Sequence, residues 1–218
     1  MKETKRLAGY PPLEEKFNIA SHGFGLIASV FAIVILIIHA GKYGDVWYVV
    51  SCSLYGASLI LLYAASTIFH SAKTDEIRYK LNVFDHTSIF VLIAGTYTPL
   101  TLVTLHGTVG WIIFGLIWAM ALTGVILKFF LIGKHRLLST IMYVLMGWTA
   151  VLVIKPLINN MATEGLLWLL AGCLSYTIGA LFFYREKMKF NHAIFHLFVL
   201  LGSFCHFITV YYYVLPVK

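Results

Sequence analysis

Long apolar runs, separated by short polar or charged segments, make up nearly the whole chain. Most runs are close to the ~20 residues that an α-helix needs to cross the hydrocarbon core of a bilayer. They are about twice as long as the strands of a membrane barrel and lack the strict alternation of such strands. The pattern therefore predicts an all-α integral membrane protein, a bundle of seven transmembrane helices at residues 17–40, 46–70, 84–105, 109–130, 137–154, 165–184 and 192–215.

One stretch without formal charge is too long to be a single span. No Lys, Arg, Asp or Glu occurs from His86 to Leu127. As one helix this stretch would be about 63 Å long, roughly twice the thickness of a bilayer core. The chain must therefore turn back within it, and we expect the turn at His106-Gly107-Thr108.

The composition supports a membrane protein. Of the 218 residues, 60% are hydrophobic and 11% are charged, and the mean hydropathy is +0.86. Soluble domains carry about 25% charged residues, so this chain has too few charges to cover a water-facing surface. A soluble enzyme, a coiled coil and a disordered chain are thereby excluded. We expect a polar cytoplasmic tail at residues 1–16 and one multi-pass domain of the cell membrane at residues 17–216.

The basic residues predict the orientation of the bundle. The net charge of +7 forms no dense basic tract, so we expect no nucleic-acid partner. Basic residues gather instead in the tail and in alternate loops, and the positive-inside rule then places the N-terminus in the cytoplasm and the C-terminus outside. Thirteen fall on the inner side, at Lys2, Lys5, Arg6, Lys16, Lys73, Arg78, Lys80, Lys128, Lys134, Arg136, Arg185, Lys187 and Lys189, and three on the outer side, at Lys42, Lys155 and Lys218.

Ionisable residues at membrane depth cost roughly 2.5–3.5 kcal/mol each on insertion scales, so each is a candidate functional residue. His70 ends the second predicted span, Asp85 opens the third, and His192 and His196 open the seventh. The predicted topology puts these four residues at one depth, near the cytoplasmic face.

This arrangement predicts a metal site. His192 and His196 are four residues apart, so they share one helix face and could bind one ion together. His70 would supply a third nitrogen and leave a fourth position for water, the open arrangement of a catalytic zinc ion. Asp85 could orient a ligand or hydrogen-bond that water, and Ser66, one turn before His70, could do the same.

Other interpretations of these polar residues stay open. The histidine pair could instead hydrogen-bond at the membrane interface. His22 forms a helical stripe with Asn18 and Glu15, which is either an interhelical hydrogen-bond seam or a contact to a polar group of a substrate. His206 lies about 15 Å deeper than His196 and is expected in an internal polar network. We expect His86 to face the membrane interface.

Several motifs in this order resemble the haemolysin III family, the bacterial branch of the family that contains the progestin and adiponectin receptors. They are Phe17-Asn-Ile-Ala-Ser-His22, Ser66-Thr-Ile-Phe-His70, Asp85-His86, His192-Ala-Ile-Phe-His196 and Gly202-Ser-Phe-Cys-His206. The resemblance implies a zinc ion held by His70, His192 and His196 near the cytoplasmic face, with Asp85 on its water and Ser66 nearby. It also implies a kinship with metal-dependent hydrolases of lipid amides.

Three functions compete at this point. The first is a zinc-dependent hydrolase of a lipid amide or ester, with membrane lipids as partners, a lipid or fatty-acyl ligand, and Asp85 as general base or water-positioning group. The second is a haemolytic, pore-forming protein, as the family name suggests. The third is a sensor or receptor in which zinc is only structural.

Overall fold

The computed structural model describes residues 9–130, 136–185 and 187–215. Within these ranges, seven helical segments are long and apolar enough to cross a membrane, as predicted. Residues 1–8 of the predicted tail and residue 216 of the predicted domain lie outside the described part. So do Lys2, Lys5, Arg6, Lys134 and Lys218 of the charge argument.

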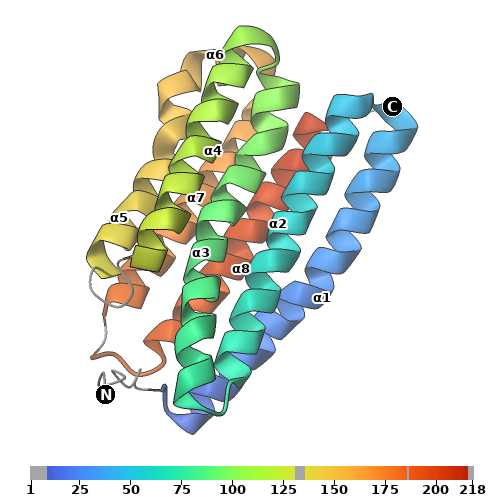
Figure 1. Ribbon diagram of the computed structural model, residues 1–218. Coiled ribbons are helices and arrows are strands. Elements are labelled where there is room, and N and C mark those ends of the chain that lie inside the picture. Colours follow the sequence, from blue (N-terminus) through green and yellow to red (C-terminus); the bar gives the residue numbers. More distant parts are fainter. Residues whose placement is uncertain (1–8, 131–135, 186, 216–218) are drawn as a thin grey trace.

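The helices form an elongated bundle of roughly parallel and antiparallel rods (Figure 1). In chain order the spans are α1 (Pro12–Tyr43), α2 (Val46–Ser71), α3 (Asp75–Pro99) with a π-helical end at Leu100–Thr104, α4 (Gly107–Phe130), α5 (Arg136–Gly147) continued through α6 (Ile154–Asn160), α7 (Thr163–Tyr184), and α8 (Asn191–Thr209) with a π-helical end at Val210–Val214. Sequential helices α1 to α4 pack side by side, and α8 packs against both α7 and α1 and so closes the bundle.

The predicted turn between the third and fourth spans is confirmed. His106 and Gly107 both have positive φ, of 22° and 75°. Glycine adopts this left-handed region without steric cost. The chain thus reverses directly between the π-helical end of α3 and the start of α4.

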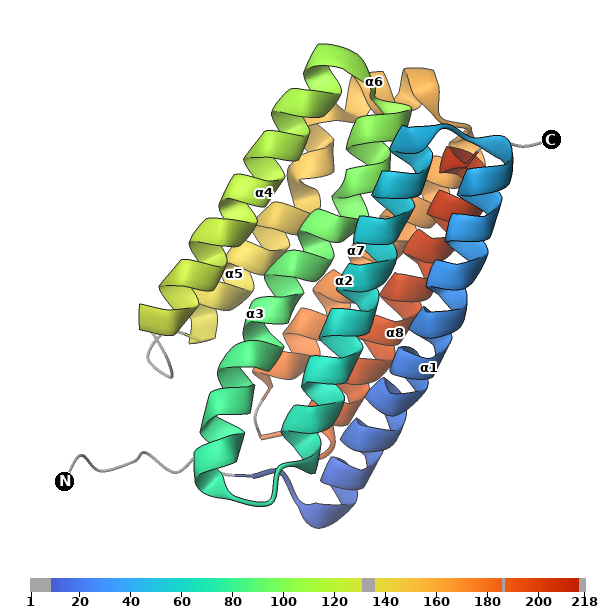
Figure 2. The same cartoon turned by 45° about the vertical axis from the view of Figure 1, so that its right-hand side comes forward.

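Two helices begin earlier than the apolar runs suggested. α1 starts at Pro12 instead of residue 17, and α3 starts at Asp75 instead of residue 84. Proline is favoured in a first turn, and acidic side chains there interact well with the helix dipole. Glu14 and Glu15 occupy the first turn of α1, while Asp75 and Glu76 occupy that of α3. We call the end where α1 and α3 begin the lower end; there α1, α2 and α3 extend beyond α4 and α5 (Figure 2).

The fifth span is helical to Asn160, beyond the predicted end at residue 154, but it is not a continuous α-helix. A 3-10 segment at Trp148–Val153 separates α5 from α6. The Tyr97 hydroxyl of α3 fits this break, since it donates to the Gly147 carbonyl at 2.8 Å and accepts from Ala150 N–H at 2.7 Å. Backbone groups freed inside a membrane must be satisfied internally, and Tyr97 does this here.

Candidate metal centre

Three histidines predicted as metal ligands meet at the lower end of the bundle. His70 comes from the last turn of α2, and His192 and His196 come from the first turns of α8. His192 Nε2 lies 3.1 Å from His70 Nε2 and 3.0 Å from His196 Nε2. One ligand nitrogen from each ring falls within 4.8 Å of the others, and all three side chains are buried. The cluster is therefore able to hold a metal ion.

Each Nδ1 atom has a partner from α1 or the segment before it. His70 Nδ1 donates to Glu15 Oε2 at 2.7 Å. His196 Nδ1 lies 3.2 Å from Ser21 Oγ, whose own proton is donated to the Asn18 carbonyl. The third ring, His192, has its Nδ1 3.0 Å from the Tyr10 hydroxyl. Outer partners of this kind fix the orientation and tautomer of metal-binding histidines.

These contacts determine which ring nitrogens carry protons. The carboxylate of Glu15 accepts only, so His70 is protonated at Nδ1 and has a lone pair at Nε2. Ser21 already donates elsewhere, so it accepts from His196, which likewise has a lone pair at Nε2. At most one proton, on His192, is then available for three converging Nε2 atoms. A cation at their centre would satisfy all three lone pairs, so the donor set fits a metal ion.

The start of α1 supports two of the three ligands. Glu15 Oε1 accepts from Tyr10 N–H at 3.1 Å and forms an ion pair with Arg78 of α3. Glu14 Oε1 accepts from the backbone N–H of His192 at 3.1 Å and so satisfies a free donor in the first turn of α8. The Tyr10 ring stacks on His192 with a centroid distance of 4.4 Å. Tyr10, Glu14 and Arg78 were not among the predicted site residues.

The stripe of Glu15, Asn18 and His22 faces the metal centre. Asn18 Nδ2 lies 3.4 Å from His70 Nδ1, beside the Glu15 bond. His22 stacks on His196, with ring centroids 3.4 Å apart and an angle of 8° between the planes. Neither ring nitrogen of His22 has a hydrogen-bond partner among the described residues. A hydrogen-bond seam therefore describes Glu15 but not Asn18, because Asn18 Nδ2 and the protonated His70 Nδ1 are both donors. The ring nitrogens of His22 stay available for another molecule.

Asp85 and Ser66 line the same cavity as His192 and His196. Both side chains are buried, and the cavity of about 120 Å³ also contacts His22, His192 and His196. Ser66 and the buried Lys128 of α4 are among the polar groups that act on the Asp85 carboxyl. Within the described part of the chain, the ligand group contains the three histidines without Asp85. Asp85 therefore shares the cavity with His192 and His196 but does not belong to the ligand group.

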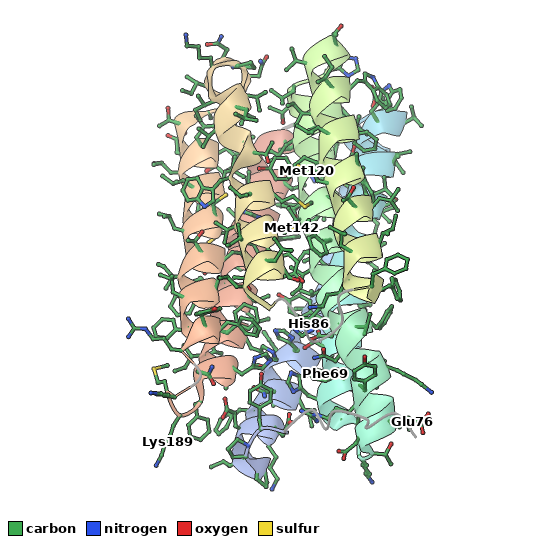
Figure 3. All side chains as sticks on the ribbon, turned by 60° about the vertical axis from the view of Figure 1, so that its left-hand side comes forward. Phe69, Glu76, His86, Met120, Met142 and Lys189 are labelled. Atoms are coloured by element: carbon green, nitrogen blue, oxygen red, sulfur yellow. The ribbon has the colours of Figure 1, made fainter. Side chains whose placement is uncertain are left out.

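His86 is not directed to the membrane interface, so that expectation is wrong. The residue lies between the helices (Figure 3), has its ring 6.3 Å from that of Phe183 between centroids, and lines the cavity. Its Nδ1 is 2.8 Å from the Asn82 carbonyl and 3.8 Å from Asp85 Oδ2. Consecutive side chains of α3 point about 100° apart around the helix axis. Asp85 and His86 can therefore both line one wide cavity.

The cavity continues away from the metal centre into the apolar interior. Its walls come from α2, α3, α5, α7 and α8, and they include Leu62, Ile89, Leu92, Ile93, Leu169 and Val199. Its polar residues far along α7 and α8 are Cys173, Tyr176 and His206. His206 Nε2 donates to the Leu169 carbonyl at 3.3 Å and lies 4.0 Å from Cys173 Sγ. The expected polar network around His206 is therefore present.

Fold and site together define a multi-pass membrane protein of seven spans with a buried three-histidine cluster at one end. A family model described as "Haemolysin-III related" matches residues 11–207, a range that includes every predicted site residue. The chain belongs to this family, as the sequence motifs indicated. Membership also agrees with a location in the cell membrane.

Three relatives illustrate the range of the family. Hemolysin-3 of Bacillus cereus is 46% identical over 203 residues, which are 93% of this chain and 93% of the relative. The Hemolysin-3 homolog of Bacillus subtilis (strain 168) is 41% identical over 204 residues, 94% and 96% of the two chains. Monocyte to macrophage differentiation factor of Homo sapiens is 30% identical over 206 residues, 92% of this chain and 84% of the relative.

Proposed function

We propose that the protein is a zinc-dependent hydrolase that cleaves an amide or ester bond of a membrane lipid. The observation that carries this proposal is the convergence of three buried Nε2 atoms beside an apolar cavity, which His192 and His196 line together with Asp85 and Ser66. Three histidine ligands with a free fourth position are typical of catalytic zinc. An apolar chamber inside a seven-helix bundle suits a lipid chain.

Each residue of the site has its own role in this proposal. His70, His192 and His196 hold the zinc ion, which supplies Lewis-acid activation of a carbonyl group and of a water molecule when it is bound. Asp85 accepts a proton from the attacking water or orients it. The Ser66 hydroxyl, which lies beside the Asp85 carboxyl, donates to an oxygen of the reacting group. His22, whose ring nitrogens have no hydrogen-bond partner in the described part of the chain, contacts the polar part of the lipid.

The lipid enters from the cytoplasmic leaflet in this proposal. Basic residues predict that the lower end of the bundle faces the cytoplasm. The histidine cluster lies at that end, so the reacting bond lies near the inner interface and the acyl chain extends toward the middle of the membrane. Apolar walls along the cavity support this placement.

Zinc content gives the first test. The purified protein is expected to hold about one zinc ion per chain, and the double variant His192→Ala, His196→Ala to lose it, because one remaining imidazole binds too weakly. Elemental analysis after dialysis measures the ion. His39→Ala with His106→Ala is the matched control, since neither residue lines the cavity. Stoichiometric zinc in the His192, His196 variant would exclude this site.

Hydrolysis gives the second test. The zinc-loaded protein in lipid nanodiscs is incubated with a panel of N-acyl amides and acyl esters, and released fatty acid is measured by mass spectrometry. Asp85→Asn keeps the side-chain volume and removes the proton acceptor, so it is expected to retain zinc and lose at least a hundredfold in rate. A panel that yields no product, from protein with bound zinc, would favour a structural ion in a sensor.

Pore formation is a second candidate, because two relatives carry the name Hemolysin-3. Ion flux through liposomes made of ether lipids without amide or ester bonds separates the two candidates. If the protein is a hydrolase, we expect no ion conductance in such membranes. Conductance that persists after zinc removal would favour the pore.

A further inference from the structure

The cavity has a second polar end far from the metal centre. His196 and His206 are ten residues apart on α8, and both line the same cavity. At 1.5 Å per residue, this spacing corresponds to about 15 Å along the helix axis. That is roughly half the ~30 Å thickness of a bilayer core. His206 therefore lies near the depth at which an acyl chain from one leaflet would end.

The His206 ring has one nitrogen engaged and one free. Nε2 carries the proton, because it donates to the carbonyl of Leu169. Nδ1 is thus a lone-pair acceptor, and no described residue donates to it. The side chain is only 6% exposed. A buried acceptor left without a donor is unfavourable, so this nitrogen favours any ligand that brings a donor.

Helix packing holds this ring in one position. A Cβ atom at Gly172 of α7 would overlap the Nε2–Cδ2 edge of His206, so the absence of a side chain there lets the ring lie directly on α7. The Tyr176 ring packs against it with centroids 5.4 Å apart. Because the Nε2 edge faces α7, the Nδ1 edge faces away from that helix. The acceptor is therefore fixed in place before any ligand binds.

Apolar side chains such as Leu62, Leu92, Ile93 and Val199 make up most of the wall between the two polar ends. The polar residues Thr96, Tyr143 and Thr177 also line the cavity, but each donates its hydroxyl proton to a backbone carbonyl. A polar ligand group therefore has its favourable places near the metal centre and at His206. A zigzag of carbon–carbon bonds of about 1.5 Å advances roughly 1.3 Å per carbon. A distance of about 15 Å then corresponds to a chain of about twelve carbons.

We propose that His206 is a specificity-determining residue that hydrogen-bonds a hydroxyl group about twelve carbons along the acyl chain of the ligand. The inference rests on the proposed function and narrows its substrate class to lipids with a hydroxylated acyl chain. The hydroxyl donates to His206 Nδ1, while the carboxyl or amide end lies beside His70, His192 and His196. No bond is formed or broken at His206.

Competitive binding of simple fatty acids tests the proposal without hydrolysis. The zinc-loaded protein is incubated with equal amounts of dodecanoic, 6-hydroxydodecanoic and 12-hydroxydodecanoic acid, and native mass spectrometry counts each bound acid. An apolar cavity with no specific acceptor disfavours both hydroxy acids, because a buried hydroxyl without a partner is costly. We expect the 12-hydroxy acid to exceed dodecanoic acid about fivefold, the gain of one net hydrogen bond, and the 6-hydroxy acid to bind less than either.

Two variants test whether His206 causes the preference for the 12-hydroxy acid. His206→Phe keeps a flat ring and removes the acceptor, so it is expected to bind dodecanoic acid and to lose the preference for the 12-hydroxy acid. His39→Phe, whose side chain lies outside the cavity lining, is expected to keep the preference. If His206→Phe does not fold, the comparison of the 6- and 12-hydroxy acids on the wild-type protein decides.

Equal or weaker binding of the 12-hydroxy acid compared with dodecanoic acid would overturn the proposal and leave water as the partner of His206. The same holds if His206→Phe retains the preference. A protein that discriminates the acids but releases no product from the lipid panel would retain this binding site and lose the enzymatic proposal. The two failures are therefore distinguishable.

Discussion

Glu15 connects the metal centre to the first helix through a single carboxylate. One oxygen accepts from His70, and the other accepts from Tyr10 N–H and the Arg78 guanidinium. Glu15→Gln keeps the shape but weakens the bond that orients His70, and outer partners of this kind are worth about 10–100-fold in metal affinity. We expect a loss of zinc affinity in that range, measured by competition with a chelator.

Glu76→Gln is the control for this prediction. Glu76 also pairs with a basic residue, Lys80, but the pair is exposed and belongs to one turn of α3. Exposed pairs contribute little, so zinc affinity is expected to stay unchanged. If Glu15→Gln binds zinc as tightly as the wild type, Glu15 has no role in positioning the ligand.

At this scale the sequence predicted the three histidines of the candidate site but not the residues that hydrogen-bond to them. His70, His192 and His196 stand out because an ionisable group is rare inside apolar runs. Tyr10 and Arg78 lie in polar segments, where such residues are ordinary, and only the fold brings them to His192 and Glu15. The orientation of His86 likewise depends on how α3 is rotated against α2 and α5, which periodicity alone does not determine.

Close packing between α1 and α2 depends on Gly25. A Cβ atom there would lie 2.5 Å from Cδ1 and 2.6 Å from Cε1 of Tyr63. The Tyr63 ring cannot easily move away, because its hydroxyl donates to Ser203 Oγ at 2.7 Å. Gly25→Ala is therefore expected to destabilise the protein by about 1–3 kcal/mol, as overpacked cores do, and to lower the midpoint of thermal unfolding in detergent.

Gly115 of α4 provides the comparison, since a Cβ atom there meets no atom within 4 Å. Alanine is a better helix former than glycine by about 1 kcal/mol. Gly115→Ala is thus expected to leave the midpoint unchanged or raise it slightly. Equal midpoints for the two variants would show that α1 can shift to admit the methyl group.

The sequence predicts the number of transmembrane spans better than it predicts where each helix begins and ends. Each span must be long and apolar to cross a bilayer, so the seven runs are visible in the sequence. The first turns of α1 and α3 carry charged residues, which hydropathy assigns to loops although helix-dipole interactions favour them. The break at Trp148–Val153 is compatible with the fifth span because Tyr97, far away in the sequence, satisfies its backbone.

Orientation of the whole bundle decides which leaflet supplies the substrate. Lys189 and Glu76 mark the lower end (Figure 3). Asn159 of α6 lies at the far end of the fifth span, which runs from the lower end to the opposite one. The positive-inside rule predicts a cytoplasmic lower end. Both Lys189 and Asn159 are exposed, so single cysteines there report the side of the membrane.

A membrane-impermeant maleimide is expected to label Asn159→Cys in right-side-out vesicles and Lys189→Cys only in inverted vesicles. The wild-type protein is the control for background, because Cys52 and Cys205 are buried and Cys173 is half-buried. The reverse pattern would place the metal centre at the outer leaflet. Zinc binding at His70, His192 and His196 would survive that result, but the lipid chain that reaches toward His206 would then have to come from the outer leaflet.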